Sequence, residues 1–418
     1  MGIYLLCIKG GKYMYGVVLE GGGAKGAYHI GAYKAVLEHG FDVGAIVGTS
    51  VGALNGAMIV QGDFDKAYEL WKNVNYTDII KANEDEIDRL KDIRLTKEDL
   101  RSLLNKLREI IKDGGFDITP LKNLLDQHID EEKIRNSKID YGLVTVNISD
   151  LKPLKLFKED IPYGEMKNYI LASCYLPVFK KERINGKLFL DGGYYNNLPF
   201  DMLVERGYND MIIIRTNALG IARRVPYDEY NIITIAPSEN IGNSFTYEKD
   251  IAVQNIKLGY FDALKGIKGL KGNKYYFHPL GEEYYFDLLK NIKETTLNSL
   301  AKTLNITEVA NKRLLFEVII PKISKLLELK GNYDYEDFVL NLVEVLLAYY
   351  EIEKFKIYDF KECLEIIKKQ PNLIIPNQTN TLDKILEKAN ITNVFRREDT
   401  TLNVAYDFIK DIEVQYAD

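Results

Sequence analysis

Residues 17–26 read Val-Val-Leu-Glu-Gly-Gly-Gly-Ala-Lys-Gly, and residues 45–52 read Ala-Ile-Val-Gly-Thr-Ser-Val-Gly. Each stretch begins with apolar residues typical of a buried strand and passes through glycines into a helical pattern. The two helical patterns cover residues 24–39 and 51–61, and the first stops at Gly40, a helix-ending signal. The order strand–helix–strand–helix predicts a βαβ crossover and a parallel sheet.

The second stretch contains a serine in a Gly-x-Ser-x-Gly turn, formed by Gly48, Ser50 and Gly52. On a tight strand-to-helix turn such a serine exposes its hydroxyl group, and the flanking glycines permit the turn. The following helix would place the Val51 N–H and the positive end of the helix dipole beside Ser50. The pattern favours Ser50 as a nucleophile, and the alternative is a glycine-rich turn that packs closely on the sheet.

The first glycine turn is open to two interpretations. Gly21, Gly23 and Gly26, followed by Asp42, fit the Gly-x-Gly-x-x-Gly fingerprint of a dinucleotide-binding fold. The Gly-Lys-Ser/Thr ending of a phosphate-binding P-loop is missing, because Lys25 is followed by glycine.

An oxyanion hole explains both turns at once, whereas a dinucleotide fold has no use for a nucleophile on its second strand. The backbone N–H groups of Gly21, Gly22, Gly23 and Val51 would then face the oxygen of a tetrahedral intermediate formed at Ser50. Removing one such donor typically costs about 10²–10³ in rate.

Ser50 needs a base, and the chain has only four histidines: His29, His39, His128 and His278. Ser50, Asp191 and His278 follow the chain order of an α/β-hydrolase triad. In that fold, however, the nucleophile turn follows several earlier strands, and here it follows the second.

Asp191 is the competing base. The Asn185-Gly186 pair predicts a hairpin between residues 179–184 and 187–190, whose second strand leads into Asp191-Gly192-Gly193. The ordinary role of an Asp-Gly pair is to cap a turn. A carboxylate with a pKa near its usual value of about 3.9 is a weak base, but burial beside Ser50 would raise that pKa.

Taken together, the segments at 21–26, 48–52 and 191–193 resemble the patatin-like phospholipase family in their order and spacing. The resemblance spans roughly residues 15–280. The Ser-x-x-x-Pro segment within residues 172–179 and Asn196-Asn197-Leu198-Pro199 also look like parts of that family.

The resemblance implies a Ser–Asp dyad on a three-layer α/β/α sheet, with Ser50 as the nucleophile and Asp191 as the proton acceptor. The glycine loop would form the oxyanion hole, and further glycines would support the motifs: Gly26, Gly48, Gly52, Gly192 and Gly193. The implied substrates are phospholipids, lysophospholipids or other acyl-ester lipids, and no metal or organic cofactor is implied. The family often has Arg where this chain has Lys25. A lysine keeps the positive charge but cannot form the paired hydrogen bonds of a guanidinium group.

The sequence divides into an extension (1–14), a catalytic domain (15–284) and a helical C-terminal region (285–418). A helical cap at about 63–135 interrupts the catalytic domain, and residues 97–112 show an amphipathic pattern within it. Further strands are expected at 141–147, 211–216, 231–236 and 275–278. From about residue 290 helical patterns take over, and the one at 335–350 is apolar on nearly all sides, which predicts a buried helix.

The net charge of −6 and the pI near 5.6, without a basic block, argue against nucleic-acid binding. Cys7, Cys174 and Cys363 form neither a metal-binding spacing nor a disulfide framework. With no signal peptide and no membrane-spanning stretch, we expect a cytoplasmic protein that visits membrane surfaces transiently. Two other hypotheses stay open: a catalytically inactive lipid- or partner-binding protein, and acyl transfer to an acceptor other than water.

Overall fold

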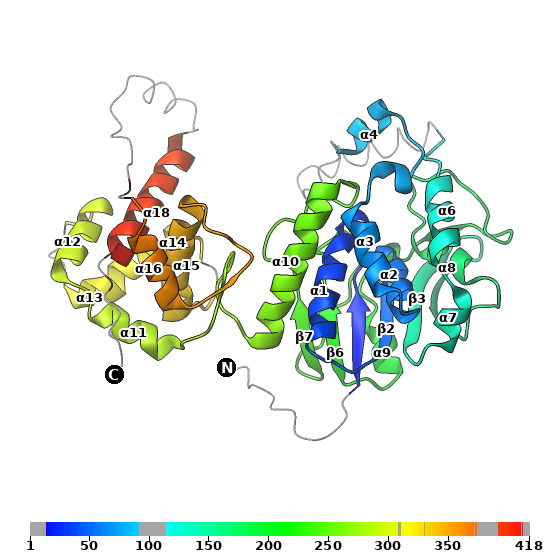
Figure 1. The fold of residues 1–418 in the computed structure, drawn as a ribbon, viewed down its shortest axis with the longest axis horizontal. Coiled ribbons are helices and arrows are strands. Elements are labelled where there is room, and N and C mark those ends of the chain that lie inside the picture. The colour runs from blue at the N-terminus through cyan, green and yellow to red at the C-terminus, as the bar shows by residue number, and fades with distance from the viewer. Residues whose placement is uncertain are drawn as a thin grey trace. The chain divides into compact units, whose positions relative to one another are not determined.

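The computed structural model describes residues 14–91, 114–307, 311–329, 331–371, 373, 392–410 and 412. Most of the predicted extension, including Cys7, and the predicted helix at 97–112 lie outside these ranges. The chain forms two compact units, Met1–Lys268 and Gly269–Asp418. Figure 1 shows the helices and strands of both units.

A seven-stranded sheet forms the centre of the first unit, in the order β4-β3-β2-β1-β6-β7, and β5 pairs with β3. The strands are β1 (Tyr15–Leu19), β2 (Val43–Thr49), β3 (Asp140–Asn147), β4 (Lys152–Phe157), β5 (Phe189–Asp191), β6 (Asp210–Ile214) and β7 (Asn231–Ile235). β1, β2, β3, β6 and β7 are parallel, whereas β4 and β5 run antiparallel to β3. The parallel strands end at one edge of the sheet, which we call the carboxyl edge.

Helices cover both faces of this sheet. α1 (Gly26–Glu38), α2 (Val51–Val60) and α10 (Lys249–Lys268) lie on the face turned to the viewer in Figure 1. α1 and α10 pack so closely that a Cβ atom on Gly31 would lie 1.8 Å from the Ile256 carbonyl oxygen. On the other face, α9 (Phe200–Glu205) buries Met202 and Leu203 against strand residues that include Val47. The predicted three-layer α/β/α fold is therefore confirmed.

A helical segment connects α2 to β3, where the sequence predicts a cap. Its described elements are α3 (Phe64–Lys72), the 3-10 turn η2 (Tyr76–Asp78), α4 (Glu84–Lys91), α6 (Thr119–His128) and α7 (Glu131–Asn136). α6 begins at the predicted Thr-Pro pair, with Pro120 in its first turn. α8 (Met166–Ser173) follows β4 and leads toward β5.

The predicted hairpin is only partly correct. Asn185 and Gly186 form the tight turn, with φ angles of 49° and 75°, and an isolated bridge joins Ile184 to Lys187. However, residues 179–184 form no strand, because β5 pairs with β3 instead. The sequence reasoning also missed β4, which contains Pro153. Because β4 lies at the edge of the sheet, it tolerates a residue without a backbone N–H.

The second unit is mainly helical, as predicted, with a two-stranded sheet. Its elements are β8 (Tyr276–Phe277), α11 (Glu282–Lys290), α12 (Glu294–Thr303), α13 (Lys312–Leu314), the π-helical turn η4 (Leu315–Ile319), α14 (Ile320–Leu326), α15 (Tyr335–Tyr349), β9 (Ile357–Tyr358), α16 (Phe360–Lys368) and α18 (Thr392–Lys410). α15 is the buried helix that the apolar pattern predicts, with Phe338, Leu342 and Leu346 fully enclosed.

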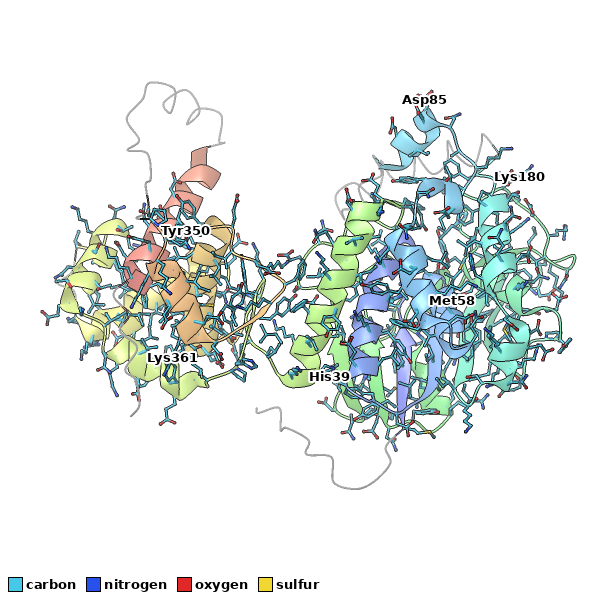
Figure 2. The ribbon with its side chains drawn as sticks, in the orientation of Figure 1. His39, Met58, Asp85, Lys180, Tyr350 and Lys361 are labelled. Atoms are coloured by element: carbon cyan, nitrogen blue, oxygen red, sulfur yellow. The ribbon has the colours of Figure 1, made fainter. Side chains whose placement is uncertain are left out.

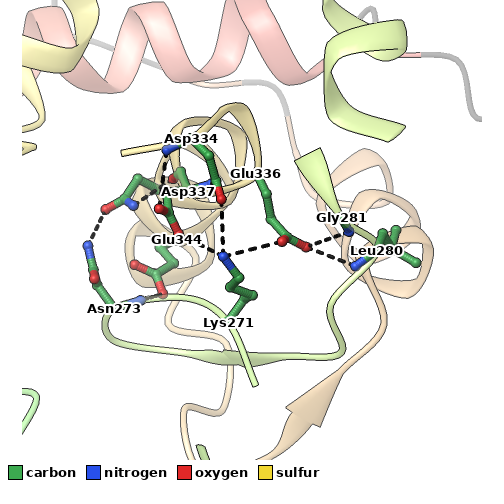
Figure 3. Close-up of polar contacts among 9 residues, drawn as sticks. Lys271, Asn273, Leu280, Gly281, Asp334, Glu336, Asp337 and Glu344 are labelled. Atoms are coloured by element: carbon green, nitrogen blue, oxygen red, sulfur yellow. Dashed lines mark hydrogen bonds and ion pairs between the residues drawn. The ribbon is translucent and has the colours of Figure 1, made fainter. Parts of the chain in front are cut away.

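The strand predicted at 275–278 does form, as β8, but it pairs with β9 in the second unit and not with the large sheet. Two carboxylates of α15 attach this segment, as Figure 3 shows. Glu344 accepts hydrogen bonds from the backbone N–H groups of residues 273–275, at 2.6–2.9 Å. Glu336 accepts those of residues 280 and 281. These bonds bind residues 271–281 to α15, and the division between the units therefore falls at 268/269, ahead of the predicted 284/285.

Candidate active site

Ser50 stands at the turn between β2 and α2, in a conformation that few residues other than glycine adopt. Its φ is 56° and its ψ is −127°, and such backbone strain in a non-glycine residue is typical of functional turns. A Cβ atom on Gly48 would lie 2.3 Å from the backbone of Gly52, and one on Gly52 would lie 2.2 Å from the Leu19 carbonyl oxygen. The two flanking glycines therefore allow α2 to start directly against the sheet.

Three neighbouring segments hold this turn in place. The Ser50 N–H donates to Ser173 Oγ at 2.9 Å, and that hydroxyl donates to the Val144 carbonyl at 2.7 Å. Thr49 Oγ1 donates to the Asn196 carbonyl at 2.8 Å. Sequence reasoning noticed the segments that contain Ser173 and Asn196 but assigned them no role, because the contacts join residues far apart in the chain.

Strand β3 brings Ser50 and Asp191 together. β4 pairs along one edge of β3. On the other edge Thr49 pairs with Val144, and Asp191 pairs with the next residue, Thr145. The nucleophile turn and the acidic turn therefore leave the sheet at neighbouring positions.

Asp191 is a buried carboxyl group with an incomplete set of hydrogen bonds. It is 3% exposed, and its Oδ1 accepts the Gly193 N–H at 2.8 Å. Its Oδ2 has no hydrogen-bond partner among the described residues. Burial raises the pKa of Asp191 from 3.8 to about 6, and the nearby Ser50 side chain and the Gly193 N–H act in the opposite direction. A base with such a pKa is mostly ionised at neutral pH and still able to take up a proton.

The glycine loop offers fewer free donors than predicted. The Gly21 N–H donates to the Asn197 carbonyl at 3.1 Å and is not free for an oxyanion. The N–H groups of Gly22, Gly23 and Val51 donate to no acceptor in the part of the chain that the structure describes. These three groups are the remaining candidates for an oxyanion hole.

Thr216, just beyond β6, fixes the orientation of the peptide that links Gly21 to Gly22. Its Oγ1 donates to the Gly21 carbonyl at 2.6 Å. Because this peptide is trans, the Gly22 N–H points away from that carbonyl. The buried carboxylate of Glu20 in turn accepts the Thr216 N–H at 2.7 Å. Thr216 is a residue that sequence reasoning missed, since no motif marks it.

Lys25 and Gly26 close the glycine loop. Lys25 Nζ donates to the Thr216 carbonyl at 3.4 Å, and burial lowers the pKa of Lys25 while Glu20 raises it. A Cβ atom on Gly26 would lie 2.4 Å from Val51 Cγ2. Gly26 therefore permits contact between the first turns of α1 and α2.

None of the four histidines, all of which lie in described ranges, hydrogen-bonds to Ser50 or Asp191. His278 follows β8 in the second unit, and its N–H donates to the Tyr358 carbonyl. His29 is fully buried, which lowers its pKa to about 3, and its Nδ1 lies 3.4 Å from Asn55 Nδ2. His39, labelled in Figure 2, caps the end of α1 through the Ala35 carbonyl.

Two other features surround the site. The Cys174 thiol lies near Ser50, but burial and the Asp191 charge raise its pKa, which keeps it protonated. A cavity of about 650 Å³ lies among α2, α3, η2 and α6, with Leu54, Met58 and Trp71 in its wall (Met58 is labelled in Figure 2). Neither Ser50 nor Asp191 lines it.

Within the described residues, no three or more His, Cys, Asp or Glu side chains gather in an arrangement that could hold a metal ion. In the same part of the chain, none of the helices combines the length and the apolar character needed to cross a bilayer.

Residues 17–204 match the family model for patatin-like phospholipases. Similar proteins include the putative patatin-like phospholipase domain-containing protein M110.7 of Caenorhabditis elegans, 26% identical over 209 residues, or 48% of this chain and 16% of that protein. Patatin-like phospholipase domain-containing protein 6 of Homo sapiens is 26% identical over 204 residues, or 47% and 13%. Lysophospholipase NTE1 of Eremothecium gossypii is 27% identical over 277 residues, or 64% and 16%. The matched part is therefore a small fraction of each relative's length.

Among solved structures, VipD from Legionella pneumophila is similar at 14% identity and a TM-score of 0.37, covering 97% of this chain and 92% of that one. The type III effector protein ExoU is similar at 15% identity and a TM-score of 0.33, covering 95% and 80%. The family match itself confirms the resemblance seen in the sequence: residues 17–204 are similar to the patatin-like phospholipase family.

Proposed function

We propose that this chain is a serine lipid acyl hydrolase of the phospholipase A or lysophospholipase type, with Ser50 as nucleophile and Asp191 as base. The observation that carries the proposal is the buried Asp191 carboxyl group, whose pKa the adjacent Ser50 side chain lowers and whose Oδ2 accepts no well-aligned hydrogen bond from the described residues. A buried carboxylate oxygen without a donor is costly, and a base that awaits a proton explains why the cost is tolerated.

In the proposed reaction, Ser50 Oγ attacks the ester carbonyl carbon while its proton passes to Asp191. The carbonyl oxygen becomes an oxyanion, which the N–H groups of Gly22, Gly23 and Val51 would stabilise. When the intermediate collapses, Asp191 returns the proton to the departing alcohol and an acyl-Ser50 ester remains. Asp191 then takes a proton from water, whose oxygen attacks the acyl group. The fatty acid leaves as Ser50 regains a proton from Asp191.

Two alternatives receive less support from the structure. A Ser-His-Asp triad needs a histidine on Asp191, and none of the four hydrogen-bonds to it. An inactive binding protein would have no use for a buried Asp191 Oδ2 that accepts no well-aligned hydrogen bond. It would also have no use for the strained backbone of Ser50. Acyl transfer to another acceptor shares the acyl-enzyme with hydrolysis, so it differs only in the second step.

Relatives named as lysophospholipase and patatin-like phospholipase domain proteins suggest lysophospholipids and phospholipids as substrates. A test compares hydrolysis of phosphatidylcholine, lysophosphatidylcholine, triacylglycerol and a short-chain nitrophenyl ester by the wild type and three variants. We expect Ser50→Ala and Asp191→Asn to abolish hydrolysis of every substrate and His278→Asn to retain most of it. A wild-type level in the Ser50 variant would refute the proposal, and a large loss in the His278 variant would favour the triad.

A further inference from the structure

Large apolar side chains are exposed on the loops that leave the carboxyl edge. Leu219 and Ile221, each 58% exposed, lie in the loop after β6, and Leu151, 86% exposed, lies in the turn after β3 together with Ile148. Tyr194, in the turn after Asp191, is about half exposed. We call these five residues the edge patch. Single exposed apolar residues are ordinary, but several on the loops of one edge indicate an interaction surface.

The loop that carries Leu219 and Ile221 is fixed to the rest of the unit. Its start is bound to Glu20, which accepts the Asn217 N–H at 2.9 Å, and its end is buried at Val225. In between, the Ile221 N–H donates to the Gly193 carbonyl at 2.9 Å, and the Ile221 carbonyl accepts the Asn197 N–H at 2.6 Å. The backbone of Ile221 is therefore held by two hydrogen bonds while the side chains of 219 and 221 face solvent.

The charges beside the patch favour a weakly anionic partner. Arg224 and Lys152 are exposed and form no ion pair within 4.0 Å of any described residue, and the Lys152 charge helps to lower the pKa of the nearby Asp150. The other charges nearby are paired: Arg223 contacts Asp201 at 2.8 Å, and Lys187 contacts Asp150 at 2.7 Å. The surface thus combines an apolar centre with a small excess of positive charge, a combination that suits a lipid surface containing anionic headgroups.

We propose that the edge patch is a docking surface for a lipid bilayer, into which Leu219 and Ile221 insert at the boundary between headgroups and acyl chains. The inference rests on the proposed function, because it places a bilayer next to Ser50. It also explains the position of the patch: the 217–224 loop is bonded to Gly193 and Asn197, next to Asp191 and Gly21. A lipid at the docked surface would have a short path to the dyad.

The test measures co-sedimentation of the full chain with phosphatidylcholine vesicles, with and without phosphatidylglycerol. All proteins carry Ser50→Ala so that lipid hydrolysis does not alter the vesicles. The test variant is Leu219→Ser with Ile221→Ser. Its matched control is Met14→Ser with Leu37→Ser, two exposed apolar residues at the opposite edge of the sheet. We expect the test variant to bind at least about tenfold more weakly, since each inserted aliphatic side chain contributes apolar area, and the control to bind like the parent.

A second measurement places a fluorescent side chain in the patch. Above the emission of the buried Trp71, which both variants share, Leu219→Trp should add a signal that shifts to the blue when vesicles are added, whereas the signal added by Leu37→Trp should not shift. The inference is overturned if the serine variant binds vesicles as the parent does, if the control loses binding equally, or if both tryptophans respond alike. These outcomes do not depend on hydrolysis, so a failure of the docking surface is distinguishable from a failure of the Ser50–Asp191 proposal.

Discussion

Asp191→Asn should abolish activity and at the same time stabilise the protein at neutral pH. Burial raises the pKa of Asp191 from 3.8 to about 6, and a shift of that size corresponds to about 3 kcal/mol. Because the folded state favours the neutral acid, this contribution to stability is fully present below about pH 4 and is lost as pH rises through about 6. The wild type at pH 8 therefore carries the full cost of a buried charge, and asparagine does not.

The expected result is a difference in unfolding free energy that depends on pH. The variant should exceed the wild type by about 3 kcal/mol at pH 8 and by about half as much at pH 5. Trp71, the only tryptophan, is buried in the first unit, Met1–Lys268, and reports its unfolding. Urea unfolding followed by its fluorescence at the two pH values measures the difference. The reasoning is refuted if the two proteins have equal stability at both pH values or differ by the same amount at both. The ionised carboxylate would then not destabilise the folded state.

Three further predictions concern the Asp191 carboxyl group, the Thr216 hydroxyl group and the Asn55 side chain. For a water-soluble ester, kcat/KM should rise with pH through about 6 as Asp191 loses its proton, and an inflection only near pH 4 would contradict the burial effect. Thr216→Val should lower kcat by roughly ten- to hundredfold with little change in KM, while Thr216→Ser, which keeps the hydroxyl, restores the rate; equal rates in both variants would exclude the positioning role. Asn55→Ala should lower the unfolding free energy by about 1–3 kcal/mol, measured by urea unfolding, because the Trp71 indole N–H loses its acceptor at 2.8 Å.

Much of the sheet could be predicted from the sequence because its parallel strands are short and apolar. The patterns at 141–147, 211–216 and 231–236 became β3, β6 and β7. The pairing of β5 could not be predicted in this way. The Asn185-Gly186 turn indicates a local hairpin, but the strand it leads into pairs with β3, more than 40 residues earlier in the sequence, and no local pattern reports that contact.

The site residues with motifs were proposed from the sequence, and those without motifs were not. Glycines mark the turns at 21–23 and 48–52 because only they allow such close backbone approach. The hydroxyl groups of Ser173 and Thr216 act through hydrogen bonds to backbone groups far away in the chain. Buried serine and threonine residues of this kind are common, so their roles become visible only in three dimensions.

For the Gly21 N–H, the role suggested by the motif differs from the contact seen in the structure. The motif suggests that every N–H of the glycine loop faces the substrate, but the structure shows that this one binds the Asn197 carbonyl. A glycine can be required for close approach without contributing a donor.

The most direct test of the central claim is covalent labelling by a fluorophosphonate, followed by mass spectrometry of the intact protein and its peptides. The Ser50–Asp191 dyad predicts one adduct per chain, located on Ser50, formed at least about a hundredfold more slowly in Asp191→Asn and at the wild-type rate in His278→Asn. An unlabelled Ser50 in the wild type, or labelling that Asp191→Asn leaves unchanged, would contradict it.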